Sequence, residues 1–283
     1  MLAAAKINLD LLITGRKDDG YHLLDSFVVF ADVGDELTAE LSDGLSLEIS
    51  GPFSGDLQGS DDNLIIKAAR LLCNEAGVPA DIKFHLIKNL PVSSGIGGGS
   101  ADAAAALKLT IEKLSLNVDE DKLNEIALKL GADVPVCLKS TACIMSGIGE
   151  EISEINLKSP AYLLLVNPGA SVSTEEVFKH SHNLRSAFDE KRQIYTDEIN
   201  FTFILDQLKE SRNSLQLAAC DIEVKITEVI NEISQTEDVL ISRMSGSGAT
   251  CFGLYKTKES CQKAAKKIKD SHKKWWIVDS QFH

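Results

Sequence analysis

The sequence predicts an α+β protein built from two modest domains. Strand-like segments alternate with segments of helical period along the 283 residues, and a new pattern begins after Pro160. From there the expected order is strand, helices, strand, turn, strand, helix, strand. A length of 283 residues suits one large domain or two modest ones. We therefore expect one domain over residues 1–156 and a second over residues 157–283.

The composition is that of a globular protein with an acidic surface. Hydrophobic residues make up 44% of the chain and charged residues 25%, which excludes collagenous, low-complexity and disordered classes. Asp and Glu number 42 against 29 Lys and Arg, so the formal net charge is −13. Because such a field repels phosphate, we expect neither nucleic acid nor a membrane surface as a partner. An anionic ligand would need a local site.

The cysteines and the first residues indicate a cytoplasmic protein. The six cysteines lie far apart without a C-x-x-C pair, which argues against zinc and for reduced, mostly buried thiols. Residues 2–5 are followed at once by Lys6, Asn8 and Asp10, so we do not expect a secretory signal. No apolar run approaches the roughly 18 residues of a membrane-spanning helix.

The first half is predicted to begin with short strands and turns. Residues 5–14 are strand-like and residues 15–20 form a charged turn, while Gly34-Asp35 and Asp43-Gly44 indicate further turns in a hairpin-rich segment. Later segments show helical period or strict alternation. The elements expected there are a helix from a cap at Asp62 or Asn63 to Gly77, a strand over residues 81–87, a helix opened by a glycine loop, a helix over about residues 119–130, and a strand pair over residues 142–147 and 149–155.

The second half repeats this mixture with longer helices. A capping box at residues 173–176 begins one of them, and a polar stretch at residues 180–198 separates it from the next. The expected elements are a strand over residues 161–167, two or three helices to about Ser234, strands over residues 239–244 and 250–255 joined by the loop SGSGA, an amphipathic helix over residues 258–271, and a strand over residues 275–282.

The glycine loop is the strongest functional signal. Residues 91–100, PVSSGIGGGS, hold four glycines in five positions between a predicted strand and a predicted helix. Without Cβ atoms such a backbone can approach a ligand closely, and the first amides of the helix attract an anion. No Walker lysine, third Rossmann glycine or protein-kinase signature is present. The loop is either a phosphate cradle or a flexible turn.

The loop resembles the phosphate loop of the GHMP kinases. The opening AKINL and the late motif SGSGA, residues 245–249, fit the same family. Within it, GYH at residues 20–22, DNLI at 62–65, LGADVPV at 130–136 and STEEVF at 173–178 resemble members whose alcohol substrate carries a cytidine diphosphate, in the non-mevalonate isoprenoid pathway. The resemblance implies the GHMP fold, with a mixed N-terminal domain and a ferredoxin-like C-terminal domain, and an ATP-dependent kinase.

The resemblance also implies a catalytic pair. Asp133 falls on the position of the base that accepts the hydroxyl proton, and Lys6 on the lysine that keeps this base ionised and lowers the hydroxyl's pKa. From the residues alone, an ordinary Asp that caps the turn after Gly131 is the favoured interpretation. Lys6, between Ala5 and Ile7 on a strand, would ordinarily face solvent.

The ATP side is implied by the loop and its flanks. The matching positions are Asn63, Lys88, Pro91, Ser94, Gly95, Gly97, Gly98, Gly99 and Ser100. Ser100 is also the position expected to contact Mg²⁺, although it could simply cap the helix. Asp102 could assist the metal or merely favour the helix dipole. Asn63 has an alternative role as the N-cap of its helix.

The acceptor side is implied by a different set. In the family, Tyr21 and Phe178 would sandwich the cytosine ring and His22 would hydrogen-bond its edge. Asn8 and Thr174 would lie near the erythritol and its phosphate, and the loop with Gly246 and Gly248 would close over the diphosphate. Otherwise Phe178 would be a core anchor, and the two glycines would serve a turn.

Two other readings stay open. Another small-molecule GHMP kinase, for homoserine or mevalonate, shares the loop and the base but has no reason to carry GYH and STEEVF. A non-catalytic, kinase-like protein would be expected to lack Lys6 or Asp133, and both are present. The departures from the family pattern are Ala4, Glu175, Ser214 and Gln216, and none of them removes a proposed catalytic group.

Overall fold

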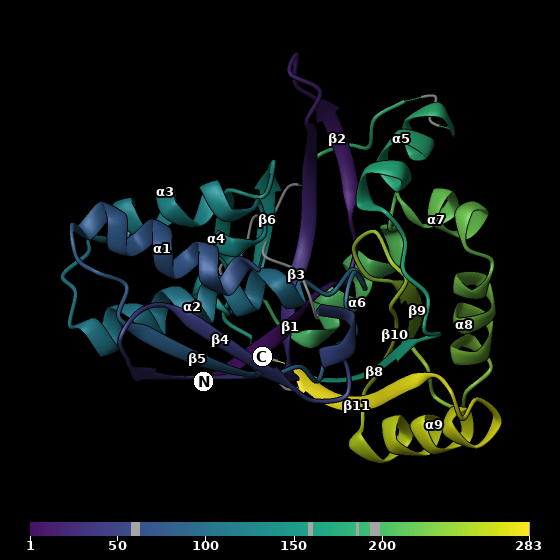
Figure 1. The fold of residues 1–283 in the computed structure, drawn as a ribbon. Coiled ribbons are helices and arrows are strands. Elements are labelled where there is room, and N and C mark those ends of the chain that lie inside the picture. The colour runs from purple at the N-terminus through teal and green to yellow at the C-terminus, as the bar shows by residue number, and fades with distance from the viewer. Residues whose placement is uncertain (58–62, 158–160, 185–186, 193–198, 283) are drawn as a thin grey trace. The chain divides into compact units, whose positions relative to one another are not determined.

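The structure is a computed structural model that describes residues 1–57, 63–157, 161–184, 187–192 and 199–282 (Figure 1). The chain divides into two compact units, each assembled from separate stretches. The first unit comprises Met1–Ala5, Val33–Val92 and Gly97–Ser140, and the second comprises Lys6–Asp32, Ser93–Ile96 and Thr141–His283. The expected domain boundary at residue 156 therefore stays a prediction.

The first unit pairs β3 (His22–Leu41), β4 (Ser46–Ser50) and β5 (Ile82–Ile87), adds the start of β1 (Leu2–Asn8) against β3, and carries the helices of the N-terminal half. The second part of β3 lies antiparallel to β5, and β4 lies parallel to β5. The turn at Asp43-Gly44 exists, but β5 lies between the strands that it joins, so they form no hairpin. The helical elements of this unit are η1 (Ser54–Leu57), α1 (Leu64–Ala76), α2 (Gly98–Leu114), α3 (Glu120–Leu130) and α4 (Val134–Lys139).

Helix α1 begins and ends as predicted. The side chain of Asn63 accepts a hydrogen bond from the backbone N–H of Ile65, and Gly77 closes the helix in the left-handed conformation with φ of 68°. The buried face of α1, which includes Ala68 and Leu72, turns toward the unit's interior, and α1 contacts the alanine-rich α2. Small alanine side chains on α2 let the two helices approach closely.

The predicted turn at Gly34-Asp35 is wrong, because β3 runs through both residues. A Cβ atom at Gly34 would lie 2.2 Å from the carbonyl oxygen of Ala3, so glycine is required for the close approach of β1. The Asp35 carboxylate is buried and accepts backbone N–H groups of Asn89 and Leu90. Both residue types serve packing in an extended strand here, although the dipeptide is typical of turns.

Two further expectations need correction. The single strand over residues 5–14 is two strands, β1 (Leu2–Asn8) and β2 (Leu12–Arg16). Between them the backbone of Leu11 bonds to Arg212 and Ser214, which bends the chain. The segment before β6 also forms a short helix, α4, with Pro135 in its first turn, where a missing N–H is tolerated.

The second unit contains a four-stranded antiparallel sheet in the order β11–β8–β10–β9. With helices between β8 and β9 and between β10 and β11, this is the order of a ferredoxin-like βαββαβ sandwich, as expected. Helix α9 lies along β8 and β11 (Figure 1). The elements are β8 (Ala161–Asn167), α5 (Thr174–Leu184), α6 (Phe201–Glu210), α7 (Gln216–Ile222), α8 (Lys225–Ser234), β9 (Ile241–Met244), β10 (Cys251–Tyr255), α9 (Lys258–Ser271) and β11 (Trp276–Phe282).

This unit also contains β2, the first part of β3, β6 (Cys143–Gly147) and β7 (Glu151–Glu154). Residues 22–25 and 24–28 of β3 pair antiparallel with β2 and β6 respectively, and β7 pairs with β6. The helices that pack on the ferredoxin-like sheet contribute core residues three or four positions apart, which lie on one face of each helix. On α8 these are Ile226, Val229 and Ile233, each fully buried and each contributing about 1.5–3 kcal/mol.

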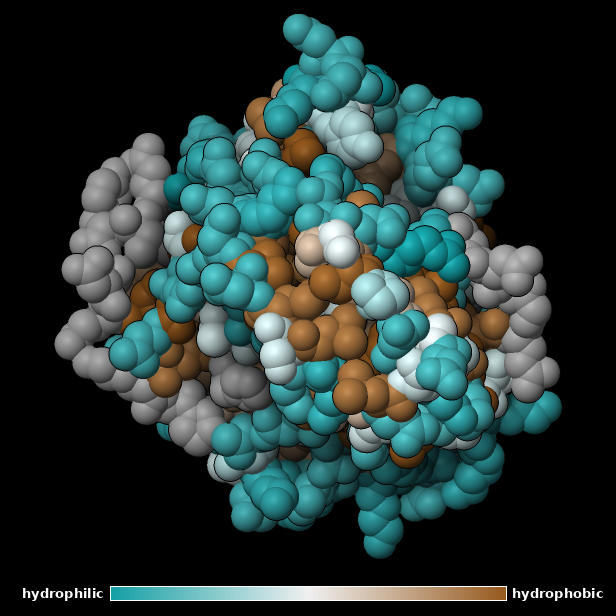
Figure 2. Space-filling view, turned by 60° about the vertical axis from the view of Figure 1, so that its left-hand side comes forward, coloured by the Kyte–Doolittle hydropathy of each residue, from teal (hydrophilic) through white to brown (hydrophobic). Residues whose placement is uncertain are grey.

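Figure 2 shows one face of the molecule, where hydrophilic residues border patches of hydrophobic ones. The most exposed large hydrophobic side chains among the described residues are Leu217, in α7, and Val224, just after it.

Five of the six cysteine side chains are buried, as expected. Of the helices in the described ranges, none has both the length and the apolar character needed to cross a bilayer.

Asp189 anchors the segment at residues 187–192 to the rest of the second unit. Its carboxylate accepts the backbone N–H of Ile13 at 2.8 Å and the hydroxyl of Ser214 at 2.6 Å, and it pairs with Arg212. Although burial opposes the charged form, these hydrogen bonds and the Arg212 charge lower the pKa of Asp189. The folded state therefore prefers the ionised carboxylate.

We predict that Asp189→Asn lowers the free energy of unfolding by about 2 kcal/mol at pH 7 and by less near pH 3. Because the folded pKa lies below the unfolded one, the contribution is present above the unfolded pKa and is lost as pH falls through the folded pKa. Urea unfolding at both pH values measures the difference. Asp206→Asn, in an exposed pair on α6, is the control. An equal penalty at both pH values would contradict the charge-based anchor.

Candidate active site

The glycine loop opens α2, as predicted. Gly97 is the N-cap in the left-handed conformation, with φ of 66°, and α2 begins at Gly98. The N–H of Ala101 bonds to the carbonyl of Gly97, which closes the first turn. The N–H groups of Gly98, Gly99 and Ser100 have no helical carbonyl four residues earlier to which they could donate. They are therefore the donors that an anion can use.

A buried ion cluster lies directly under this turn. The Lys88 ammonium is 2.8 Å from Asp102 Oδ2 and also pairs with Asp35, and the three side chains are at most 5% exposed. A Cβ atom at Gly98 would lie 3.2 Å from Lys88 Nζ, so the cluster touches the first residue of α2. Since Lys88 follows β5 and Asp102 belongs to α2, the cluster ties the strand before the glycine loop to the helix after it.

The cluster is electrostatically tight. Burial raises the pKa of Asp102 to about 7, against the opposing effect of Lys88 and with help from the Asp35 charge. Burial works against the charged form of Lys88, but its two carboxylate partners raise the pKa of this ammonium. Asp102 Oδ1 is buried and has no hydrogen-bond partner among the described residues. This oxygen is therefore an acceptor without a partner in the described ranges, near the start of α2.

The sequence assigned Lys88 to ATP and missed Asp35. In the structure the Lys88 ammonium faces two carboxylates, so its contact with the nucleotide stays a prediction. Asp35 was hidden by its turn-like neighbour Gly34, although an acidic residue in the middle of an apolar strand segment is itself a signal of a buried ion pair. Asn63 caps α1, and its contact with ATP also stays a prediction.

In the second unit, the predicted loop at residues 245–249 packs against the backbone of residues 93–96. Gly95 has φ of 74°, and a Cβ atom on it would lie 2.6 Å from the carbonyl oxygen of Ser245 and 2.7 Å from the nitrogen of Gly248. A Cβ atom at Gly246 would lie 2.7 Å from the carbonyl oxygen of Gly95. The N–H of Thr250 donates to the Ser94 carbonyl at 3.0 Å. Glycines at positions 95 and 246 are thus required by backbone packing.

Two predicted acceptor-side residues lie against the same loop. The backbone N–H of Asn8 donates to Ser245 Oγ at 3.1 Å, and a Cβ atom at Gly246 would lie 3.5 Å from Asn8 Oδ1. Thr174, the first residue of α5, places its hydroxyl 2.9 Å from that of Ser247. The structure therefore brings Asn8, Thr174 and the loop of Gly246 and Gly248 together.

Two of the three predicted base-binding residues, His22 and Phe178, lie together in an aromatic cluster. The rings of His22 and Phe178 are stacked, with centroids 5.0 Å apart and an interplanar angle of 27°. His182 adds an edge contact to His22 at 6.2 Å, and it was missed although it follows Phe178 by one helical turn. Phe178 also packs against the hydrophobic core, as its alternative role required, while Tyr21 is 60% exposed.

The proposed catalytic residues lie in different units. Lys6 belongs to the second unit and its side chain is buried, so the expectation of an ordinary solvent-facing lysine is wrong. Asp133 belongs to the first unit and precedes α4, but its side chain makes no capping hydrogen bond to this helix. The simple capping role is therefore not observed, and the pairing of Lys6 with Asp133 stays a prediction.

Known proteins share this fold and these motifs. Residues 63–141 match the model of the GHMP kinases N terminal domain, and residues 205–274 match that of the GHMP kinases C terminal domain. Among solved structures, a 4-(cytidine 5'-diphospho)-2C-methyl-D-erythritol kinase has a TM-score of 0.80 at 29% identity, covering 100% of this chain and 98% of its own. An L. major mevalonate kinase has a TM-score of 0.69 at 16% identity, covering 99% and 94%, which shows the fold alone.

Curated relatives are similar along the full length. The 4-diphosphocytidyl-2-C-methyl-D-erythritol kinase of Paramagnetospirillum magneticum is 43% identical over 99% of this chain and 96% of its own. The kinase of the same name from Rhodospirillum rubrum is 40% identical over 97% of this chain and 89% of its own. The chain therefore belongs to the GHMP kinases, and within them to the family of the 4-diphosphocytidyl-2-C-methyl-D-erythritol kinases.

We predict that Asp35→Ala lowers the free energy of unfolding by about 3–5 kcal/mol, because it removes one partner of a buried ion cluster and leaves two backbone N–H groups unpaired. Asp43→Ala, at an exposed turn of the same unit, should change it by less than about 0.5 kcal/mol. Denaturant unfolding of both variants checks this. Equal stabilities would show that the cluster contributes nothing to the fold.

Proposed function

We propose that this chain transfers the terminal phosphoryl group of ATP to the 2-hydroxyl of 4-diphosphocytidyl-2-C-methyl-D-erythritol, giving ADP and the 2-phosphate. The observation that carries the proposal is the full-length similarity to relatives that bear this substrate's name, at up to 43% identity. The contacts of Asn8 and Thr174 with the loop at residues 245–249 support it. We place the reaction in the cytoplasm, because free cysteine thiols are typical of proteins in a reducing compartment.

In the proposed mechanism the chain positions two substrates and moves one proton. The N–H groups at the start of α2 and the backbone of the glycine loop bind the ATP phosphates, where the helix dipole favours negative charge. Asp133 accepts the proton of the acceptor hydroxyl, and the positive charge of Lys6 stabilises the developing alkoxide. The hydroxyl oxygen then attacks the terminal phosphorus as the bond to ADP breaks.

The residues present fit a magnesium ion bound together with ATP. Mg²⁺ usually takes one or two protein ligands and completes its shell with phosphate oxygens and water, so a cluster of three acidic ligands is not needed. The Ser100 hydroxyl in the first turn of α2 and the unpartnered Oδ1 of Asp102, two residues further along the helix, are the oxygen atoms that could bind it. When bound, the ion neutralises phosphate charge.

The cytidine end of the acceptor is assigned to the aromatic cluster. A cytosine ring between Tyr21 and Phe178 would gain stacking area, and the His22 ring nitrogen would read its edge. Since His22 already stacks on Phe178, binding of the base requires His22 to shift or the base to extend the existing stack.

We predict that Asp133→Asn and Lys6→Met each lower kcat at least about 100-fold, because the first removes the group that accepts the proton and the second removes the charge that stabilises the alkoxide. An ADP-release assay compares them with wild type on the cytidyl substrate, homoserine and mevalonate in parallel. Asp121→Asn, exposed on α3, is the matched control and should retain activity. Equal rates for Asp133→Asn would remove Asp133 from the mechanism, and turnover of another acceptor alone would refute the substrate.

We predict that Gly99→Ala raises the KM for ATP about tenfold while the melting temperature stays the same or rises. Among the described residues, a Cβ atom at Gly99 would meet the Leu64 side chain alone, at 3.6 Å. This part of the chain therefore does not require glycine there, whereas a phosphate held by the backbone would.

The control for this variant is Gly55→Ala, where a Cβ atom meets no atom of the described ranges within 4 Å. It should change neither the KM for ATP nor the melting temperature. Gly95→Ala, in contrast, should lower the melting temperature and disrupt the contact with the loop at residues 245–249, because its Cβ atom would overlap the backbone of Ser245. An unchanged KM for ATP in Gly99→Ala would remove this residue from the nucleotide site.

A further inference from the structure

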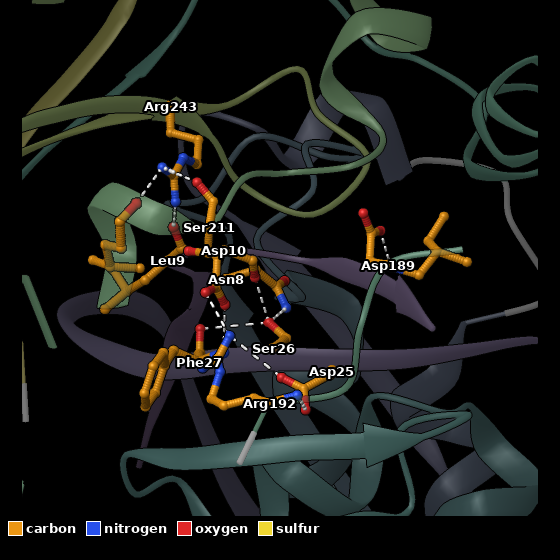
Figure 3. A network of polar contacts seen from close by, with 12 residues as sticks. Asn8, Leu9, Asp10, Asp25, Ser26, Phe27, Asp189, Arg192, Ser211 and Arg243 are labelled. Atoms are coloured by element: carbon orange, nitrogen blue, oxygen red, sulfur yellow. Dashed lines mark hydrogen bonds and ion pairs between the residues drawn. The ribbon is translucent and has the colours of Figure 1, made fainter. Parts of the chain in front are cut away.

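Three charged side chains meet inside the second unit (Figure 3). Arg192 Nη2 lies 2.5 Å from Asp10 Oδ2 and 3.3 Å from Asp25 Oδ1, and the guanidinium carbon lies 3.8 Å above the centre of the Phe27 ring. All three charged side chains are at most 5% exposed. Asp10 follows β1, Asp25 belongs to β3, and Arg192 comes from the segment anchored by Asp189. The ion cluster therefore joins three distant stretches of chain.

The cluster fixes the backbone beside it. Asp10 Oδ1 accepts the N–H of Phe27 at 2.8 Å, and Asp25 Oδ2 accepts the backbone N–H of Arg192 at 3.2 Å. Because a buried carboxylate without its cation is costly, the Asp10 main chain is held in one place as long as Arg192 is present. The carbonyl oxygen of Asp10 is thereby fixed relative to β3.

A hydroxyl transmits this constraint to Asn8. Ser26 Oγ donates to the carbonyl oxygen of Asp10 at 2.5 Å, and Asn8 Nδ2 lies 2.8 Å from the same Oγ atom. A serine hydroxyl has one proton. Since that proton is given to Asp10, Ser26 can only accept from Asn8, and the NH₂ group of the Asn8 amide must face Ser26.

The other end of the amide is then determined. Asn8 Oδ1 points toward the loop at residues 245–249, as shown by its 3.5 Å distance from a Cβ atom built at Gly246. A carbonyl oxygen accepts hydrogen bonds and cannot donate them. The group that Asn8 meets in a ligand must therefore carry a proton, as a hydroxyl does and an ionised phosphate oxygen does not.

We propose that Ser26 and the Asp10–Arg192–Asp25 cluster are positioning residues that hold the Asn8 amide with Oδ1 presented to a hydroxyl of the acceptor substrate. This inference rests on the proposed function for the chemical nature of the acceptor, a polyol. It adds that Asn8 distinguishes hydroxyl from phosphate, and that its orientation is imposed by residues which do not touch the substrate.

The test is a double-variant cycle with Ser26→Ala and Asn8→Ala. We expect Ser26→Ala to raise the KM for the acceptor about tenfold, the size of one oriented hydrogen bond, with the KM for ATP unchanged. If Ser26 acts through Asn8, the double variant is no worse than Asn8→Ala alone. Effects that multiply in the double variant, or an equal rise in the KM for ATP, would overturn the proposal.

Two further variants separate positioning from folding. Arg192→Lys keeps the charge beside Asp10 and should retain most of the acceptor affinity, whereas Arg192→Gln should lose as much as Ser26→Ala. Thermal melting is recorded for each, and activity is compared only well below the melting temperature. Ser42→Ala, which removes a hydroxyl bonded to a turn carbonyl in the first unit, should leave both KM values unchanged. Equal acceptor affinity in the lysine and glutamine variants would exclude a role for the cluster.

Failure of the proposed function is recognised separately. If wild type consumes ATP with homoserine or mevalonate but not with the cytidyl substrate, the substrate assignment is wrong. The cycle is then run on the acceptor that wild type uses, and the same non-additivity between Ser26 and Asn8 is expected because each of these acceptors carries a hydroxyl. Additive effects there would overturn the positioning role as well.

Discussion

The contact between two glycine segments is the constraint on which the second unit's site depends. Gly95 and Gly246 touch backbone to backbone, and any side chain at either position would overlap main-chain atoms of the other segment. This contact places the loop at residues 245–249 beside Asn8 and lets Ser247 reach Thr174. Glycine here is a packing requirement first. The positions of Asn8 and Thr174 beside this loop follow from it.

Both units solve the burial of charge in the same way, with one cation between two carboxylates. Lys88 lies between Asp35 and Asp102, and Arg192 lies between Asp10 and Asp25. In the Lys88 cluster Asp35 also accepts backbone N–H groups, and in the Arg192 cluster Asp10 and Asp25 do, so each ion cluster fixes main chain as well as side chains. Such clusters add little net stability compared with apolar packing, but they fail sharply when one member is removed.

The sequence predicted regular elements well because their signals are local. Asn63 and Gly77 bound α1, and the spacing of buried residues on α9 is visible in the chain itself. Gly34 and Asp35 were misread because their roles depend on Ala3 and on residues 88–90, which no local pattern connects to them. The GHMP motifs located the loops of the site, while Ser26 and Arg192 carry no motif and were found only through their contacts.

The buried lysine and arginine of the ion clusters cannot be the groups that attract an anionic ligand to this acidic protein. One cation between two carboxylates carries a net charge of −1, or zero where burial keeps one carboxyl protonated, as the pKa of about 7 for Asp102 allows. Neither cluster can therefore attract phosphate, although each contains a buried basic residue. The attraction must come from groups without a compensating carboxylate. In the first unit these are the N–H groups at the start of α2, whose partial charges act only at short range. An anion is therefore expected where the glycines let it touch the backbone, while the net charge of −13 disfavours it elsewhere.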